Sequence, residues 1–337
     1  METESVLAGR RILLLCRHFG GFGGEENYVR CLLDAFPDVT TDVFVTQTLS
    51  DRGLLAASRP NLTVHRYSPY HLLRHLWNHR TQTAVFIAMA ADRYEGRRWV
   101  HLALRGCRFL KAVVPAGNNV SKVACNYDRL FWEADNAADY GFGGDPRNVV
   151  MYPPALHPNS FLRPIPEVDV RGDYYLTVFN DYDSELKGGR VLRQIAGQIG
   201  RRIFWCTNGP VPDQLHENVR VFQGSRDMVA LLLASCRAYV CFSSREGFGW
   251  SLFEAMAISK PLVTRPVGIA HDYRDRIFQW NTPEELVSVL NETEFPTTVN
   301  YDLRPFEPKA YRTRLEQLIA EHESSTRRIA LKEPQGP

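Results

Sequence analysis

The hydrophobic positions of the chain form two series in which short apolar runs alternate with stretches of three-to-four-residue spacing. In the first half, apolar runs typical of buried strands fall at residues 11–17, 41–46 and 62–67, and helical spacing is found over residues 25–36. Prolines then gather at residues 152–169. In the second half, strands are predicted at 174–179, 202–207, 219–222, 238–242 and 261–264. Helices are predicted there at 189–199, 227–235, 250–258, 283–290 and 308–322.

This alternation predicts an α/β fold with two domains. Alternating strands and helices build parallel sheets covered by helices, and 337 residues are more than one core usually needs. The proline-rich stretch is the best candidate for a linker. We therefore predict Rossmann-like domains at residues 1–152 and 153–305, followed by a helix at 306–323. The polar residues 324–337 are predicted to be a disordered tail.

Composition excludes several classes of protein. Apolar residues make up 44% and charged residues 23% of the chain, as in globular proteins, and the formal charge of +2 gives no case for nucleic-acid binding. The longest apolar run, at residues 84–91, is a buried strand or a short helix, because spanning a bilayer takes roughly 20 residues. The start of the chain has no secretory pattern. The seven cysteines include no C-x-x-C pair and are predicted to be reduced thiols of a cytoplasmic protein. The histidines do not cluster with them, so no zinc site is expected.

The strongest chemical signal is the string at residues 243–257, which follows a predicted strand and opens a predicted helix. Glu246 and Glu254 stand eight positions apart, with Gly247 and Gly249 between them. Glycines let backbone N–H groups approach a ligand, and a helix N-terminus favours an anion such as a diphosphate. The two carboxylates can accept hydrogen bonds from sugar hydroxyls. The alternative is a surface loop whose glutamate complements the helix dipole.

This string resembles the E-x7-E signature of a large retaining glycosyltransferase family, glycosyltransferase family 4, which includes many bacterial mannosyl- and glucosyltransferases. The resemblance extends to residues 23–25, 149–154, 187–188, 218–224 and 260–263. It implies a GT-B fold, in which two Rossmann-like domains face each other across a cleft. The first domain would bind the acceptor and the second the nucleotide-sugar, and the helix at 306–323 would pack on the first domain.

The resemblance also assigns roles to the motif residues. Glu246 and Lys187 would be the catalytic residues: Glu246 would contact the donor sugar, and Lys187 would neutralise the leaving nucleotide diphosphate. Glu254 would contact the ribose. The donor-binding residues would be Gly23, Gly24, Gly247, Phe248, Gly249, Trp250, Ser251 and Glu254. Family members of this kind work without a bound metal, so neither a metal nor another cofactor is expected.

The implied activity is transfer of a sugar from a UDP- or GDP-sugar, with retention of configuration, to the hydroxyl of a glycan, a lipid-linked molecule or a small molecule. Two alternatives stay open: a sugar-nucleotide epimerase of the same fold, and a degenerate, non-catalytic GT-B subunit. The second is kept open because Tyr182 and Asp181 stand where the family usually has an arginine. Arg190, Arg193 and Arg245 are candidates to supply the missing charge.

The glycine-rich loop at residues 20–24 has a competing interpretation as a dinucleotide site. It follows a strand and precedes a helix, but G-x-G-x-x-G fails because Glu26 stands where the third glycine is needed, and no Gly-Lys-Ser/Thr follows for a P-loop. A nicotinamide oxidoreductase is therefore not favoured. The loop is either a tight turn or a contact to the diphosphate through Gly24. His18 and His101 are candidates for a histidine near the sugar.

One stretch is unusually basic. Residues 52–91 contain five arginines and four histidines but no acidic residue. Within it, residues 70–80 predict an amphipathic helix with Leu72, Leu73, Leu76 and Trp77 on one side. Such a helix can lie on an anionic membrane, as a peripheral contact, or can pack on the core with a solvated basic face.

Overall fold

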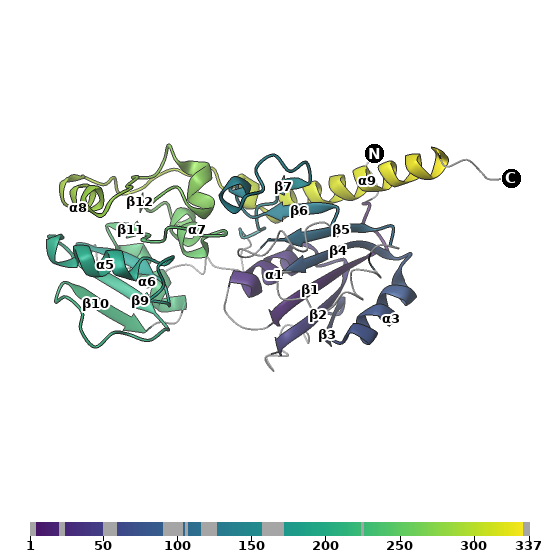
Figure 1. Cartoon of the computed structure of the whole chain (residues 1–337), viewed down its shortest axis with the longest axis horizontal. Helices are drawn as coiled ribbons and strands as arrows, with labels where there is room; N and C mark the ends of the chain where they lie inside the picture. The colour runs from purple at the N-terminus through teal and green to yellow at the C-terminus, as the bar shows by residue number, and fades with distance from the viewer. Residues whose placement is uncertain are drawn as a thin grey trace. The chain divides into compact units, whose positions relative to one another are not determined.

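The computed structural model describes residues 5–19, 24–49, 59–89, 104, 107–115, 127–156, 172–223 and 226–332. They form two compact units (Figure 1). The N-terminal unit comprises Met1–Glu133, Ala137–His157 and Arg304–Pro337, and the C-terminal unit comprises Ala134–Asn136 and Pro158–Leu303. The chain thus changes unit at 157/158 and 303/304, where the sequence predicted 152/153 and 305/306. The assignment of residues 134–136 to the C-terminal unit was not predicted.

The described part of the N-terminal unit contains a seven-stranded parallel sheet in the order β3-β2-β1-β4-β5-β6-β7. Its strands are β1 (Arg11–Phe19), β2 (Thr40–Leu49), β3 (Leu62–Arg66), β4 (Thr83–Met89), β5 (Leu110–Val114), β6 (Arg129–Trp132) and β7 (Asn148–Val150). Its helices are α1 (Gly24–Ala35), α3 (Pro69–His79) and α9 (Pro308–Lys332), with the 3₁₀ turns η4 (Ala137–Tyr140) and η7 (Arg304–Phe306).

Both faces of this sheet are covered. Leu13 and Leu15 of β1 pack in one buried cluster with Leu72 and Leu76 of α3. Side chains alternate between the faces of a strand, and the intervening Leu14 is also fully buried. Strand β1 is therefore apolar on both sides, as parallel strands between helical layers usually are.

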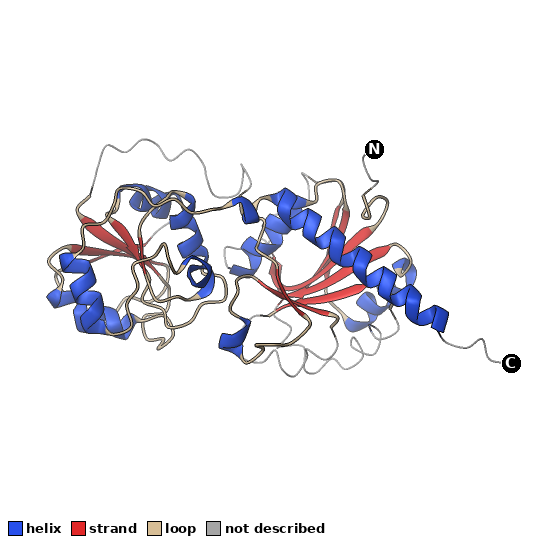
Figure 2. Cartoon of the chain, turned by 90° about the horizontal axis from the view of Figure 1, so that it is seen from above, coloured by secondary structure: helices blue, strands red, loops and turns tan. Residues whose placement is uncertain are grey.

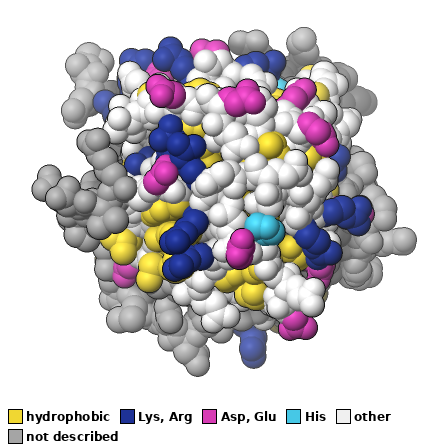
Figure 3. Space-filling view, turned by 90° about the vertical axis from the view of Figure 1, so that its left-hand side faces the viewer, with side chains coloured by type: hydrophobic (Ala, Val, Ile, Leu, Met, Phe, Trp, Pro, Cys, Tyr) yellow, Lys and Arg dark blue, Asp and Glu magenta, His cyan; other side chains and the backbone are white. Residues whose placement is uncertain are grey.

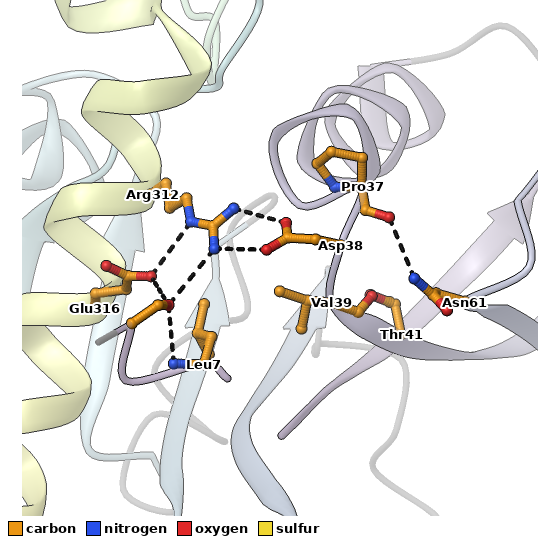
Figure 4. Close-up of polar contacts among 9 residues, drawn as sticks. Leu7, Pro37, Asp38, Val39, Thr41, Asn61, Arg312 and Glu316 are labelled. Carbon is orange, nitrogen blue, oxygen red and sulfur yellow. Dashed lines mark hydrogen bonds and ion pairs between the residues drawn. The ribbon is translucent and has the colours of Figure 1, made fainter. Parts of the chain in front are cut away.

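Helix α9 follows the C-terminal unit in sequence but belongs to the N-terminal unit. Figures 1 and 2 show it lying along the seven-stranded sheet. The Tyr311 hydroxyl lies 2.8 Å from that of Tyr28 on α1. The Arg312 guanidinium donates to both carboxylate oxygens of Asp38, at 2.6 and 2.9 Å, and to Glu316 at 3.3 Å (Figure 4).

The helix also continues further than the sequence predicted. Disorder was expected from residue 324, but α9 extends to Lys332. Residues 324–332 are polar yet contain no glycine or proline, and their arginines, alanine, leucine and lysine are strong helix formers. Polarity alone was therefore a poor guide to disorder in this segment.

The described part of the C-terminal unit contains a five-stranded parallel sheet in the order β10-β9-β8-β11-β12. Its strands are β8 (Tyr174–Val178), β9 (Arg202–Thr207), β10 (Val219–Gln223), β11 (Ala238–Val240) and β12 (Leu262–Val263). Its helices are α5 (Gly189–Ile195), α6 (Arg226–Ser235), α7 (Trp250–Ala257) and α8 (Pro283–Glu292), with 3₁₀ turns η5 (Ala196–Gln198) and η6 (Gly268–Tyr273). Trp205 and Trp280 are both fully buried in its core.

The strand order of this sheet reverses between β8 and β11. From β8 the chain builds outward through β9 to β10, and it then returns to add β11 and β12 on the other side of β8. In open α/β sheets, ligands bind beyond the carboxyl ends of the strands at such a reversal. A ligand-binding site is therefore expected in the loops that follow β8 and β11.

Gly188 allows these two loops to meet. Its φ is +80°, and a Cβ atom there would lie 2.3 Å from the carbonyl oxygen of Phe242. The amide of Ser244 donates to the carbonyl of Leu186 at 2.9 Å, which joins the loops a second time. A residue with a side chain would force the loops apart at this point.

The distribution of surface charge and the state of the cysteines match what the composition predicted. On the face drawn in Figure 3, Lys and Arg side chains are interspersed with Asp and Glu. Among the described helices, none combines the length and apolar character that crossing a membrane requires. The six cysteines in the described residues are free, and five are buried. Burial raises the pKa of the Cys206 and Cys241 thiols to about 11, which disfavours the reactive thiolate.

A matched pair of glycines tests the contact between the loops. Gly188 and Gly144 have nearly the same φ, +80° and +81°, but only Gly188 has a backbone carbonyl in the place of a Cβ; Gly144 has nothing within 4 Å. We expect Gly144→Ala to cost about 1 kcal/mol of unfolding free energy, from φ alone. Gly188→Ala should cost clearly more in urea denaturation. Equal losses would show that the contact at Gly188 is not a constraint.

A second prediction concerns Glu133, which directly follows β6. Burial raises the pKa of its carboxyl to about 8, from a usual value of 4.5. The folded state therefore holds a proton that the unfolded chain has released, so stability falls as pH rises between these values. We expect Glu133→Gln to be increasingly more stable than the wild type between pH 5 and about 8, measured as thermal unfolding. Glu321→Gln, at an exposed position on α9, is the control. A pH-independent difference would contradict the assignment.

Candidate functional site

The centre of the candidate site is an ion pair between Lys187 and Glu246. The ammonium nitrogen lies 2.8 Å from each carboxylate oxygen. Lys187 follows β8 and Glu246 follows β11, so the pair stands at the reversal of strand order. The side chains are 39% and 17% exposed, so solvent reaches both. The sequence predicted these two residues as catalytic, and the structure brings them together across 59 positions of the chain.

The loop that carries Glu246 is fixed from two sides. Asn136, which is buried, donates its side-chain N–H groups to the carbonyls of Glu246 at 3.2 Å and Gly247 at 2.8 Å. On the other side, the amide of Ile269 donates to the carbonyl of Phe248 at 2.8 Å. These contacts hold the backbone on which Glu246 stands. Asn136 could not be predicted as a supporting residue, because it lies 110 positions from Glu246 and outside any recognised motif.

The predicted donor-binding residues of this loop lie at the start of α7. Gly249 has φ +83° and occupies the N-cap position, and Trp250 and Ser251 open the helix. The first N–H groups of a helix have no partner within the helix and favour an anion. Backbone N–H groups of Gly249, Trp250 and Ser251 are thus placed at a potential anion site, while Gly247 precedes the helix cap.

Two side chains in this group turn inward. Phe248 is only 2% exposed and packs on Trp250 and Phe253, with ring centroids 4.9 and 5.5 Å away. The Ser251 hydroxyl accepts a hydrogen bond from the hydroxyl of Tyr239 at 2.7 Å. Any contact of Phe248 to a ligand would therefore be made by its backbone.

Glu254 lies further along α7 and is partly exposed. Burial raises the pKa of Tyr239 well above its usual value, and the charges of Glu246 and Glu254 raise it further. The two motif carboxylates are therefore both near the Tyr239 hydroxyl. A helix start flanked by two carboxylates and one ammonium group suits a ligand that is an anion at one end and rich in hydroxyls elsewhere.

Asp181 and Tyr182 stand where the family that the sequence resembles usually has an arginine, and in this chain both stabilise local structure. The Asp181 carboxylate accepts from the amide of Ser184 at 3.0 Å and closes an exposed turn. Tyr182 is buried, and its ring lies 5.1 Å from Trp205. Arg193 stands over the Tyr182 ring, with Cζ 5.1 Å from the centroid.

The other two arginines proposed as substitute cations differ in their surroundings. Arg190 forms an ion pair at 3.1 Å with Glu185, and both side chains are more than three-quarters exposed. Arg245 is exposed and directly precedes Glu246. By position, Arg245 is therefore the better candidate for a second cation near the ion pair.

For the glycine-rich loop at residues 20–24, only Gly24 lies within the described residues. Gly24 is the first residue of α1 and is exposed, while Gly23 and His101 lie outside the described residues. His18 is part of β1. Glu25, beside Gly24, accepts from the amide and the guanidinium of Arg17 at 2.5 and 2.9 Å, which ties the start of α1 to the end of β1.

Comparison with known proteins agrees with this geometry. Residues 213–275, which include Glu246 and α7, match the family model for glycosyl transferases group 1. No curated protein matches the chain in sequence.

Several solved structures share the fold along nearly the whole chain. Anabaena HepE, in complex with UDP and glucose, has 16% identity and a TM-score of 0.66, covering 94% of this chain and 100% of its own. The catalytic domain of starch synthase IV from Arabidopsis thaliana, bound to ADP and acarbose, has 11% identity, a TM-score of 0.61 and the same coverage. Sucrose-phosphate synthase from Thermosynechococcus elongatus has 15% identity and a TM-score of 0.56, covering 96% and 99%. The chain therefore has the two-domain, Rossmann-like fold of GT-B glycosyltransferases, and the part of its candidate site that contains Glu246 and α7 matches the group 1 glycosyl transferase model.

Proposed function

We propose that this chain is a retaining glycosyltransferase that transfers a sugar from a nucleotide-diphosphate sugar to an acceptor hydroxyl. The observation that carries the proposal is the Lys187–Glu246 pair at the reversal of strand order, beside the start of α7. This arrangement offers an anion site, a movable cation and a hydrogen-bonding carboxylate within one pair of loops. The group 1 glycosyltransferase match across residues 213–275 supports the same activity.

Donor binding follows from the α7 end of the site. The backbone N–H groups at Gly249, Trp250 and Ser251 bind the diphosphate, because a helix start carries partial positive charge. Glu254 accepts from the ribose hydroxyls. The similar structures of HepE and starch synthase IV hold UDP and ADP, which supports a nucleoside-diphosphate donor, with UDP- and GDP-sugars as the first choices.

Sugar transfer requires a positive charge beside the departing diphosphate oxygen. As the bond between the sugar and the diphosphate breaks, negative charge builds on the departing oxygen, and a preplaced cation stabilises it. Lys187 supplies that cation. Glu246 accepts from a donor-sugar hydroxyl and holds the ring while the acceptor hydroxyl attacks on the face from which the diphosphate leaves. No metal ion takes part in this proposal; the acceptor is a glycan, a lipid-linked molecule or a small molecule.

Donor hydrolysis tests the proposal without knowledge of the acceptor. We expect slow release of free sugar from one of a panel of UDP-, GDP-, dTDP- and ADP-sugars. Lys187→Ala should lower that rate roughly 10²- to 10³-fold, the usual effect of removing one charge-stabilising group. The loss would not reflect unfolding, because a half-exposed ion pair contributes about 1 kcal/mol or less to stability. Glu246→Gln should also lower the rate.

The matched control is Glu185→Gln, which changes an exposed, ion-paired glutamate on the same loop as Lys187. Its rate should equal that of the wild type. NMR of the freshly released sugar reports the anomer before it equilibrates, and the opposite configuration to the donor would rule out retention. Conversion of the donor into an isomeric nucleotide-sugar would indicate an epimerase. Absence of both hydrolysis and nucleotide binding by calorimetry would indicate a non-catalytic subunit.

We further propose a peripheral contact with the cytoplasmic surface of an anionic membrane through α3. Tyr70 and Trp77 are 74% and 71% exposed. At 100° per residue, Arg74 lies on the same side of the helix as both, and the Arg80 guanidinium stands 4.6 Å above the Trp77 ring. The sequence grouped Trp77 with the leucines, but Leu72 and Leu76 are buried and Trp77 faces outward. Exposed aromatic rings beside arginines suit a lipid headgroup region.

Vesicle flotation tests this contact. We expect binding to vesicles that contain phosphatidylserine, and much weaker binding to pure phosphatidylcholine, because the arginines require anionic lipid. Arg74→Glu with Arg80→Glu should abolish the difference. Arg220→Glu with Arg276→Glu, two exposed arginines of the C-terminal unit, is the control of equal charge change. Unchanged binding by the α3 variant would refute the contact.

A further inference from the structure

A cluster of one buried aspartate and two histidines lies in the N-terminal unit. Asp42 comes from β2, His65 from β3 and His75 from α3, and their ligand atoms all lie within 4.8 Å of one another. These three elements are neighbours (Figure 1). The side chains are 3%, 15% and 10% exposed. None of them belongs to the site proposed for the nucleotide-sugar.

The spacing of the ligand atoms suits a small tetrahedral cation. His65 Nε2 lies 3.0 Å from Asp42 Oδ1, and His75 Nε2 lies 3.3 Å from Asp42 Oδ2. Zinc binds imidazole nitrogen at about 2.0–2.1 Å and carboxylate oxygen at about 2.0–2.2 Å, so tetrahedral ligands stand roughly 3.4 Å apart. Each imidazole nitrogen is near that distance from one oxygen of the carboxylate, Oδ1 for His65 and Oδ2 for His75.

The missing hydrogen bond of His75 is a second indication of a ligand, independent of this spacing. Its Nε2 is buried and makes no hydrogen bond, although the Asp42 carboxylate is 3.3 Å away. The ring nitrogen is thus out of line with the carboxylate. Buried polar atoms are nearly always paired, and a cation among the three residues would satisfy this nitrogen.

The surroundings fix the ligands in place. Arg11 donates to Asp42 Oδ2 at 2.9 Å, which orients the carboxylate. The Oδ1 atom is at hydrogen-bond distance, 3.0 Å, from His65 Nε2, and a metal bound between these two atoms would replace that hydrogen bond. Phe44 stacks on the His65 ring at 4.6 Å and meets the His75 ring edge-on at 5.3 Å. Ligating carboxylates and imidazoles are usually held by such outer contacts. The charge of Arg11 opposes a cation, and the Asp42 carboxylate offsets it.

We infer that Asp42, His65 and His75 form a binding site for a divalent transition metal, zinc foremost. Two imidazoles and a carboxylate are ligands that zinc accepts, and water completes the tetrahedron. The metal would join β2, β3 and α3, and so hold the helix that carries Tyr70 and Trp77 against the sheet. No zinc site was expected from the sequence because its histidines do not cluster with its cysteines, whereas this ligand set contains no cysteine.

Cobalt titration of the chelator-stripped chain tests the site directly. We expect one Co²⁺ per chain, with the visible absorption of a four-coordinate nitrogen and oxygen site and without a sulfur charge-transfer band. His75→Ala should weaken binding by at least roughly 100-fold, since even outer-shell changes cost 10- to 100-fold. Zinc should raise the melting temperature of the wild type and not that of His75→Ala.

His79→Ala is the matched control. It removes the next histidine along the same face of α3, whose ring lies 4.6 Å from that of His75 but which is outside the ligand set. It should bind Co²⁺ as the wild type does. If His75→Ala does not fold, as judged by circular dichroism, Asp42→Asn and His65→Gln take its place. Failure of the wild type to bind, a thiolate spectrum, or equal binding by the ligand variants would overturn the inference.

Discussion

The candidate site depends on the close approach of two loops at the reversal of strand order. The backbone at Gly188 touches the backbone at Phe242, where no side chain fits, and the amide of Ser244 reaches the carbonyl of Leu186. Because both loops follow neighbouring strands of a parallel sheet, their first residues emerge at the same edge. This approach places the Lys187 ammonium group on the Glu246 carboxylate. A side chain at Gly188 would hold the two loops, and with them Lys187 and Glu246, further apart.

The strands and helices around the candidate site could be predicted from the sequence because their signals are local. Lys187 and Glu246 each lie between a predicted strand and a predicted helix and next to a glycine, and the resemblance to the family singled them out. Asn136 could not be found in this way. It holds the Glu246 loop through hydrogen bonds to backbone carbonyls, and any residue type can supply a carbonyl. Such a contact leaves no pattern in the sequence of the loop it supports.

The N-terminal unit was harder to predict for a different physical reason. Strands β5, β6 and β7 are three to five residues long, and β5 contains Lys111, which is buried beside Asp128 at 3.2 Å. A charged residue in a short apolar run makes the run difficult to recognise as a strand. The sequence of the run does not show the oppositely charged residue that allows the charge to be buried. The stretch at 52–91 looked purely basic for the same reason. Its His65 and His75 lie beside the Asp42 carboxylate, which belongs to β2 and is outside that stretch.

The charges around the proposed donor site have a consequence for catalysis. The Lys187–Glu246 pair is neutral as a unit, whereas a nucleotide diphosphate gains negative charge as it leaves. Under the proposed function, Lys187 therefore has to turn part of its hydrogen bonding from Glu246 to the diphosphate during the reaction. The pair is partly exposed, so this exchange costs little desolvation. Asp181 and Tyr182, which stand where the family that the sequence resembles usually has an arginine, are engaged in local structure. Under the proposed function, stabilisation of the leaving group therefore rests on Lys187 and the start of α7, without the arginine that is usual in the family the sequence resembles.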